Sequence, residues 1–187
     1  TFGGSTLLLF GGGPSVLSVR EAAPEPEARD LLFGRLAALF DPRTRGARYR
    51  QTTLAPDAPA TAALVREALF RLLGRPGPPL LVYMAAHGEQ GESPSEDSVV
   101  LWGSTVLGPP DVAEVLADPA SVRPSRLVLT SCFGGGFAEV VFDPRAPEGM
   151  PVAGDHCGLF ATDWDHVASG CDTDPGQYAP KTLGEIK

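Results

Sequence analysis

The chain has 187 residues, which suits one domain with a substantial core. Hydrophobic residues make up 43% and charged residues 20%, the balance of a soluble globular protein. A formal net charge of −8 argues against nucleic acid and anionic membranes as main partners. No apolar run approaches the roughly eighteen residues of a membrane-spanning helix. We therefore expect a soluble protein, with the cytoplasm favoured over export.

The first part of the chain alternates apolar runs with amphipathic stretches. Residues Thr6–Phe10 predict a first, central strand that ends in a glycine-rich turn without the patterns of nucleotide-binding loops. A helix is expected from about Glu27 to Phe40, followed by a more peripheral strand over Tyr49–Leu54. A second helix should run from an Asp57 N-cap to about Leu73.

The second part continues the alternation. Apolar runs around Leu80–Met84 and Leu127–Leu129 predict buried strands. Two short runs that flank Gly103 predict a hairpin outside the main sheet, and a helix should end near Asp118. Gly158–Thr162 predicts a further core strand. The sequence thus predicts an α/β fold over residues 1–187, a mostly parallel sheet with helices on both faces and a small peripheral hairpin.

One histidine and one cysteine stand just past the two buried strands. His87 and Gly88 follow the first, and Ser131 and Cys132 follow the second, before three glycines. Parallel strands deliver the residues at their carboxyl ends to one shared edge. An imidazole there can accept the thiol proton, and the thiolate is the reactive species. The bare amides of Gly88 and Cys132 suit a developing oxyanion, so the pattern predicts acyl transfer through a thioester.

These residues resemble a known superfamily. An apolar strand ending in His-Gly, then an apolar strand ending in Ser-Cys-x-Gly-Gly, is similar to the caspase-like cysteine peptidases, which include legumains, gingipains, clostripain, metacaspases and separases. The opening Leu-Phe-Gly-Gly-Gly-Pro and the later Cys-Gly-Leu-Phe-Ala-Thr and Ala-Ser-Gly-Cys-Asp are similar to bacterial members, notably from myxobacteria. The resemblance implies a three-layer caspase-like sandwich and a cysteine endopeptidase with a Cys132/His87 dyad.

The resemblance also implies a pocket for the residue before the cut bond (P1). It places that pocket near Gly11–Pro14, at Ser131, and after the last strand at Thr162–Asp165. Asp163 and Asp165 favour a basic P1 residue there, although ordinary loop acids or helix caps explain them equally well. Metacaspases often carry an acid where this chain has Ser131. Further candidates, outside the main pattern, are Asp155, with His156 or His166 as an alternative base.

Some alternatives stay open. The family's last helix and strand are not evident before Lys187, so either a second polypeptide completes the sheet, as in processed caspases, or the chain was truncated. Cys157 and Cys171 could pair and leave Cys132 free.

Other function classes are a non-catalytic caspase-like module that binds or regulates a partner, and a flavodoxin-like phosphate or nucleotide site, which rests on fold alone. The His and Cys spacing is poor for zinc. We expect no cofactor and no metal, and a protein or peptide as substrate, with a second chain or a homodimer as the possible protein partner.

Overall fold

The computed structural model describes residues 6–12, 15–21, 48–145 and 149–168. The chain forms two compact units, one of residues 1–57 with 172–187 and one of residues 58–171. The single domain that the sequence predicts over residues 1–187 stays a prediction. Residues 87, 88, 131, 132, 163 and 165 of the candidate site belong to the second unit.

The first unit contains a short antiparallel ribbon. Its strands are β2 (Ser18–Glu21) and β3 (Arg48–Gln51), paired from Ser18 opposite Gln51 to Glu21 opposite Arg48. Strand β3 confirms the predicted peripheral strand, although it begins and ends earlier than expected. The helix predicted for residues 27–40 lies outside the described residues.

The prediction of a central first strand is wrong. Strand β1 covers only Leu9–Phe10, both half-buried, and it is not a strand of the parallel sheet. The residue before it is held by Asp57: the Leu8 N–H donates to Asp57 Oδ2 (2.8 Å), and the Asp57 N–H donates to the Leu8 carbonyl (2.8 Å). These bonds also explain why Asp57 is not the N-cap of the helix that follows.

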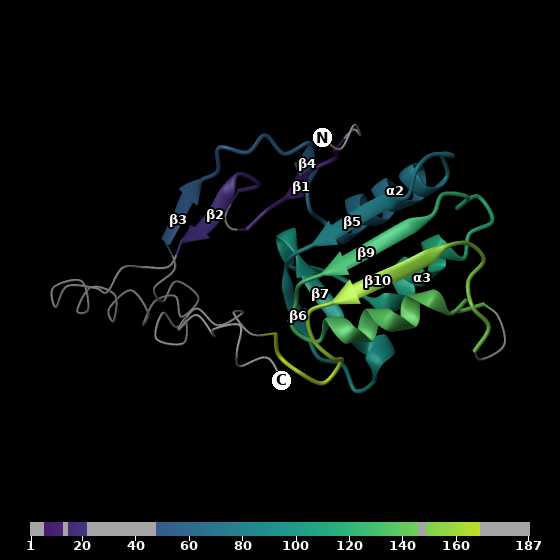
Figure 1. Cartoon of the computed structure of the whole chain (residues 1–187). Helices are drawn as coiled ribbons and strands as arrows, with labels where there is room; N and C mark the ends of the chain where they lie inside the picture. The colour runs from purple at the N-terminus through teal and green to yellow at the C-terminus, as the bar shows by residue number, and fades with distance from the viewer. Residues whose placement is uncertain (1–5, 13–14, 22–47, 146–148, 169–187) are drawn as a thin grey trace, which may run out of the picture. The chain divides into compact units, whose positions relative to one another are not determined.

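The second unit is built on a parallel sheet of three strands. The strands are β5 (Leu80–Met84), β9 (Ser125–Leu129) and β10 (His156–Phe160), in the order β10-β9-β5. All three run in the same direction, so their carboxyl ends share one edge (Figure 1). The chain is therefore a mixed α/β protein whose main sheet is parallel, as its sequence predicts.

Two α-helices pack on one face of this sheet. Helix α2 (Ala62–Leu73) begins at Thr61, whose hydroxyl accepts the Leu64 N–H, and helix α3 (Pro109–Leu116) follows the peripheral strands. Their apolar faces and the inward residues of β5 and β9 line one small cavity in the core. The buried residues are Val65, Ala68, Leu69 and Leu73 of α2 and Val112, Ala113, Val115 and Leu116 of α3.

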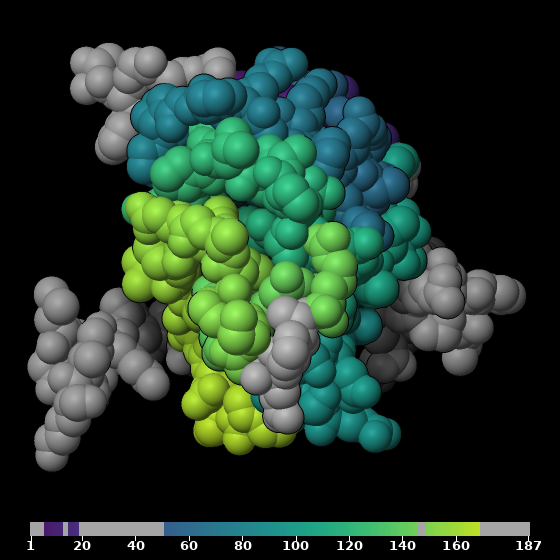
Figure 2. Space-filling view, turned by 90° about the vertical axis from the view of Figure 1, so that its right-hand side faces the viewer, coloured from purple at the N-terminus to yellow at the C-terminus, as the bar shows by residue number. Residues whose placement is uncertain are grey.

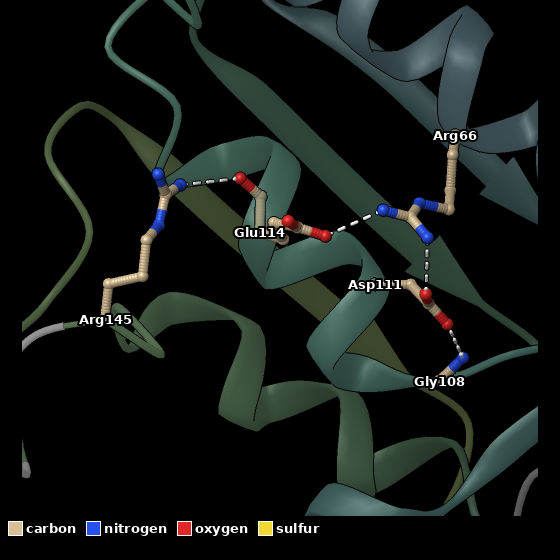
Figure 3. A network of polar contacts seen from close by, with 5 residues as sticks. All are labelled: Arg66, Gly108, Asp111, Glu114 and Arg145. Atoms are coloured by element: carbon tan, nitrogen blue, oxygen red, sulfur yellow. Dashed lines mark hydrogen bonds and ion pairs between the residues drawn. The ribbon is translucent and has the colours of Figure 1, made fainter.

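Charged side chains join the two helices on their outer side. Arg66 of α2 donates to Asp111 (3.0 Å) and Glu114 (2.7 Å) of α3, and Asp111 also accepts the Gly108 N–H (2.9 Å) before the helix (Figure 3). Arg145 donates to the Glu114 carbonyl (3.0 Å), which adds the segment after β9 to the same network.

The predicted hairpin is confirmed and is part of a second sheet. Strands β6 (His87–Glu89), β7 (Ser98–Leu101) and β8 (Thr105–Leu107) pair antiparallel in the order β6-β7-β8. Gly103, at φ 73°, makes the turn of the hairpin. The remaining elements of this unit are β4 (Ala58–Pro59) and the 3-10 helices η2 (Pro94–Glu96), η3 (Trp102–Ser104) and η4 (Gly134–Val141).

The side chains on the other face of the sheet are exposed. Leu81, Tyr83 and Leu159 keep 65%, 64% and 73% of their surface open to solvent. The described residues thus cover one face of the sheet, whereas the sequence predicts helices on both. None of the helices in the described ranges is long and apolar enough to cross a membrane.

Candidate active site

The structure makes the strands that precede His87 and Cys132 neighbours. Strands β5 and β9 pair in parallel, with Met84 opposite Leu129. The pairing continues past the strand end, since the Thr130 N–H donates to the Met84 carbonyl (2.9 Å). His87 lies three residues beyond Met84 and Cys132 two beyond Thr130. The predicted juxtaposition of the two strand ends is therefore confirmed.

The backbones of Gly88 and Cys132 are in direct contact. A Cβ atom at Gly88 would collide with the Cys132 carbonyl oxygen and would lie 2.8 Å from its carbonyl carbon and 3.3 Å from its nitrogen. Only glycine fits so close an approach of two backbones. The two residues predicted to donate to an oxyanion thus lie against each other, at the edge where parallel sheets bind ligands.

The two reactive side chains differ in exposure. His87 opens strand β6, opposite Val100, and its ring is exposed. Cys132 keeps only 9% of its surface open, and its sulfur accepts the Ala168 N–H at 3.4 Å. The same contact leaves little of the thiol open.

The residue after the cysteine has an unusual backbone. Phe133 adopts the left-handed conformation at φ 56° and ψ 17°, which is uncommon for a non-glycine residue. Its N–H donates to the His166 carbonyl (2.9 Å). Such a conformation costs on the order of 1–3 kcal/mol and is typical of functional turns. Here it reverses the chain directly after Cys132 and starts η4.

The loop after β10 lies against this turn. A Cβ at Gly135 would lie 2.6 Å from the Trp164 nitrogen and 2.7 Å from the Asp163 carbonyl carbon. Asp163 accepts the Trp164 N–H (2.8 Å), and Asp165 binds the His166 ring (2.5 Å). Both carboxylates are exposed. The structure therefore brings the two predicted specificity residues to the same edge as Cys132.

Ser131 faces the interior of the protein. Its side chain is fully buried, and its hydroxyl lies 3.4 Å from where a Cβ of Gly134 would stand. Among the described residues the hydroxyl has no hydrogen-bond partner. In this structure the Ser131 side chain packs on the inner side of the turn, and it does not reach the surface at which a substrate would bind.

His166 and His156 differ as alternative bases. The His166 carbonyl accepts the Phe133 N–H, so the backbone of His166 lies beside the cysteine turn, and His166 stays an alternative base.

His156 begins β10 and binds the Ser125 hydroxyl through Nδ1 (2.8 Å), at the opposite end of the sheet. It is therefore wrong as a base for Cys132.

Asp155 is wrong as a site residue for the same reason. The loops that lead into β5, β9 and β10 lie side by side at this opposite end (Figure 2), where the Ser125 N–H donates to the Asp155 carbonyl (3.0 Å). Arg126 donates to the Asp155 carboxylate (2.7 Å), and this bond lowers the pKa of that carboxyl. The Asp155 carboxylate is exposed, and its ion pair with Arg126 lies at the amino ends of the strands. The reactive edge, meaning the carboxyl ends of β5 and β9 with the Cys132 turn, lies at the other end.

The remaining histidine and cysteine predictions concern metal binding and a disulfide. Within the described ranges, no group of three or more His, Cys, Asp or Glu side chains could hold a metal ion. Cys157 is a free, exposed thiol on β10, and Cys171, its suggested partner, lies outside the described residues. Lys187 lies outside the described residues as well.

Sequence reasoning missed two features of this edge. Asp97 is buried and lies against the glycine turn after Cys132, although it reads as part of a polar loop. The Ala168 N–H is a backbone group, so no residue type in the sequence indicates its contact with the Cys132 sulfur. A signal for the first existed in the glycines: three in succession soon after Cys132 indicate close neighbours on more than one side.

The chain matches no family model, no curated protein and no solved structure.

Proposed function

We propose that this protein is a cysteine endopeptidase of the caspase-like type, in which Cys132 is the nucleophile and His87 the general base. The observation that carries the proposal is the backbone contact between Gly88 and Cys132 at the ends of two paired parallel strands. That contact fixes a histidine-bearing strand and a cysteine-bearing turn to each other.

The chemistry follows from these positions. His87 takes the thiol proton, and the Cys132 thiolate attacks the scissile carbonyl carbon. The amides of Gly88 and Cys132 stabilise the oxyanion that forms. The imidazolium returns the proton to the leaving amine as the C–N bond breaks, which leaves a thioester. Water, deprotonated by the same histidine, then attacks the thioester and releases the acid and the free thiol.

Specificity for Arg or Lys at P1 is the finer part of the proposal. It is supported by two exposed carboxylates, Asp163 and Asp165, in the loop that packs on the cysteine turn. A guanidinium or ammonium group gains charge-assisted hydrogen bonds from such carboxylates. Asp165 already binds His166, so Asp163 is the freer of the two for a substrate.

The test is cleavage of a fluorogenic peptide library that varies the P1 residue, with the full chain as enzyme. Cys132→Ala should abolish cleavage, and His87→Ala should lower kcat by about 10²–10⁴-fold. Cys157→Ala changes an exposed thiol at the other end of the sheet and should leave kcat unchanged. Cleavage that survives Cys132→Ala, or a folded protein that cleaves no peptide, would contradict the proposal.

His166→Ala distinguishes His87 from His166 as the base that takes the thiol proton. If His87 is the base, His166→Ala should change kcat little and leave the acidic limb of the pH–rate profile in place. A loss of that limb in His166→Ala, with His87→Ala still active, would assign the base to His166 instead.

A second candidate function is a non-catalytic caspase-like module that binds a partner. The small exposure of Cys132 and the Ala168 N–H on its sulfur favour it, since both leave the thiol covered. Alkylation by iodoacetamide discriminates between the two functions. A module of this kind would be alkylated at Cys132 far more slowly than at the exposed Cys157, at every pH, whereas an endopeptidase would react faster at Cys132.

A further inference from the structure

Asp97 is the most deeply buried carboxyl group among the described residues. It lies just before strand β7, and only 1% of its surface is exposed. One carboxylate oxygen, Oδ1, accepts the Gly91 N–H at 2.9 Å, while the other, Oδ2, has no hydrogen-bond partner among the described residues. Burying a carboxyl so incompletely paired costs free energy, which calls for a compensating role.

The free oxygen of Asp97 lies against the glycine turn that follows the cysteine. A Cβ at Gly136 would collide with Asp97 Oδ2 and would lie 2.5 Å from the Pro94 carbonyl oxygen and 2.8 Å from Asp97 Cβ. Gly136 is within the first turn of η4. The missing side chain at Gly136 is therefore what admits Asp97.

The carboxyl thus lies between two segments that bear the reacting groups. The Gly91 N–H belongs to the loop that leaves β6, four residues after His87. Gly136 belongs to the turn four residues after Cys132. A third segment also packs here, since a Cβ at Gly108 would lie 3.3 Å from the Asp97 carbonyl oxygen. The Gly88–Cys132 contact fixes these segments on one side, and Asp97 fixes them on the other.

We infer that Asp97 is a positioning residue, whose buried carboxyl holds the loop after His87 against the glycine turn after Cys132 and so sets the imidazole relative to the thiol. This inference rests on the proposed Cys132/His87 chemistry. Asp97 touches neither a substrate nor the reacting atoms and acts only through the two segments. A misplacement of about 1 Å at a reacting pair can cost on the order of 10²-fold in rate.

Three variants test the inference, all in a Cys157→Ser, Cys171→Ser background so that Cys132 is the only thiol. Asp97→Ala removes the carboxyl. Gly136→Ala places a methyl group against the Asp97 carboxyl and displaces it from the glycine turn. Asp97→Asn keeps the shape and the acceptor for the Gly91 N–H. Arg66→Gln, on the outer side of α2, is the matched control for a merely structural loss.

The readouts are kcat on the best P1 peptide, the second-order rate of Cys132 alkylation by iodoacetamide against pH, and the thermal unfolding midpoint. Asp97→Ala and Gly136→Ala should each lower kcat by about 10²-fold with KM little changed. They should shift the alkylation profile towards that of His87→Ala, at temperatures where each variant is folded. Asp97→Asn should restore both values to near those of the parent, and Arg66→Gln should lower only the unfolding midpoint.

Alkylation separates failure of this inference from failure of the proposed function. If the parent cleaves no peptide, the positioning role still stands where His87→Ala and Asp97→Ala change the alkylation profile in the same way. The role is overturned if folded Asp97→Ala keeps the parent's alkylation profile and kcat. If Asp97→Ala does not fold, Gly136→Ala decides: a folded Gly136→Ala with the parent's profile overturns the role equally.

Discussion

Two regions of the second unit are held together by different means. At the edge of the sheet that carries Cys132, backbone touches backbone: Gly88 lies on Cys132 and Gly135 on the Asp163–Trp164 peptide, while Gly136 lies on the Pro94 carbonyl and the Asp97 side chain. On the outer side of the helices, long charged side chains meet instead, with Arg66 between Asp111 and Glu114. Arg66 keeps 41% and Glu114 60% of its side-chain surface open to solvent.

The difference concerns how much change each region tolerates. Contacts between backbones leave no volume for a methyl group, and a densely packed interior transmits any shift to its neighbours. Partly exposed ion pairs are screened by water, and their long side chains can move aside. The reactive edge should therefore lose activity on the smallest substitutions, while the helix network should lose only a little stability on large ones.

The largest effect is expected from Gly88→Ala. The new methyl group would meet the Cys132 carbonyl oxygen, so strand β6 and the cysteine turn must separate. Overpacking of this kind costs about 1–3 kcal/mol of unfolding free energy, and the displaced amides should lower kcat by on the order of 10²-fold or more.

The control for Gly88→Ala is Gly77→Ala, in the loop before β5, where the nearest atom to a new Cβ is 3.5 Å away. Denaturant unfolding and peptide cleavage on both variants make the comparison. Equal behaviour of the two would mean that the reactive edge is as tolerant as a surface loop.

A smaller effect is expected from Gly135→Ala. Its methyl group would press on the Asp163–Trp164 peptide and displace the loop after β10, while leaving the Gly88–Cys132 contact in place. The expected result is a rise in KM for substrates with Arg at P1, about 10-fold, with a smaller change in kcat, because a loss of substrate binding acts on KM. Steady-state kinetics on matched Arg and Ala substrates measure it. A loss confined to kcat would place the loop outside the specificity pocket.

The sequence predicts the strands better than their surroundings. The apolar runs before His87 and Cys132 are strands whose alternating inward residues, such as Met84 and Leu129, pack in the core, while the outward Leu81 and Tyr83 stay exposed. The adjacency of the two strands is consistent with the single crossover that separates them in the chain. Local pattern does not reveal that Thr61 rather than Asp57 caps α2. The Asp57 carboxylate instead accepts the N–H of Leu8, which is distant in sequence.

The site shows the same limit. His87 and Cys132 are readable because a reactive side chain beside glycine at a strand end is a local signal. Asp97, the burial of Ser131 and the Ala168 N–H depend on which segments meet in three dimensions. Burial and close approach of this kind are tertiary properties. In the sequence, only the run of three glycines after Cys132 indicates them.

A third effect concerns the pH dependence of stability, at the reactive edge alone. Burial raises the pKa of Asp97 above its ordinary value, and the Gly91 N–H offsets this only in part. The folded protein therefore holds this proton to higher pH than the unfolded chain does. The resulting stabilisation is complete below the unfolded pKa and is lost as pH rises through the folded pKa.

Asp97→Asn removes that titration. Relative to the parent, its unfolding free energy should therefore rise as pH increases from below the ordinary Asp range to neutrality. Urea unfolding of the two proteins across this pH range measures the difference, with Asp143→Asn as a control for a more exposed carboxyl outside the edge. A difference that stays constant with pH would show that Asp97 is ionised equally in both states.

The smallest effect is expected from Arg66→Gln, in the helix network. The variant loses both ion pairs but keeps most of the side chain's apolar stem, so unfolding free energy should fall by less than about 1 kcal/mol. The loss should shrink further at about 1 M salt, where the Debye length is about 3 Å. Arg75→Gln, an exposed arginine after α2, corrects for the change in net charge.

Cleavage by Arg66→Gln should match that of the parent, because no backbone contact of the reactive edge involves α2. A loss of activity larger than the loss of stability explains would couple the helix layer to the strand ends. Such a coupling would pass through Asp111, which accepts the Gly108 N–H, and through Gly108, which packs near the Asp97 carbonyl.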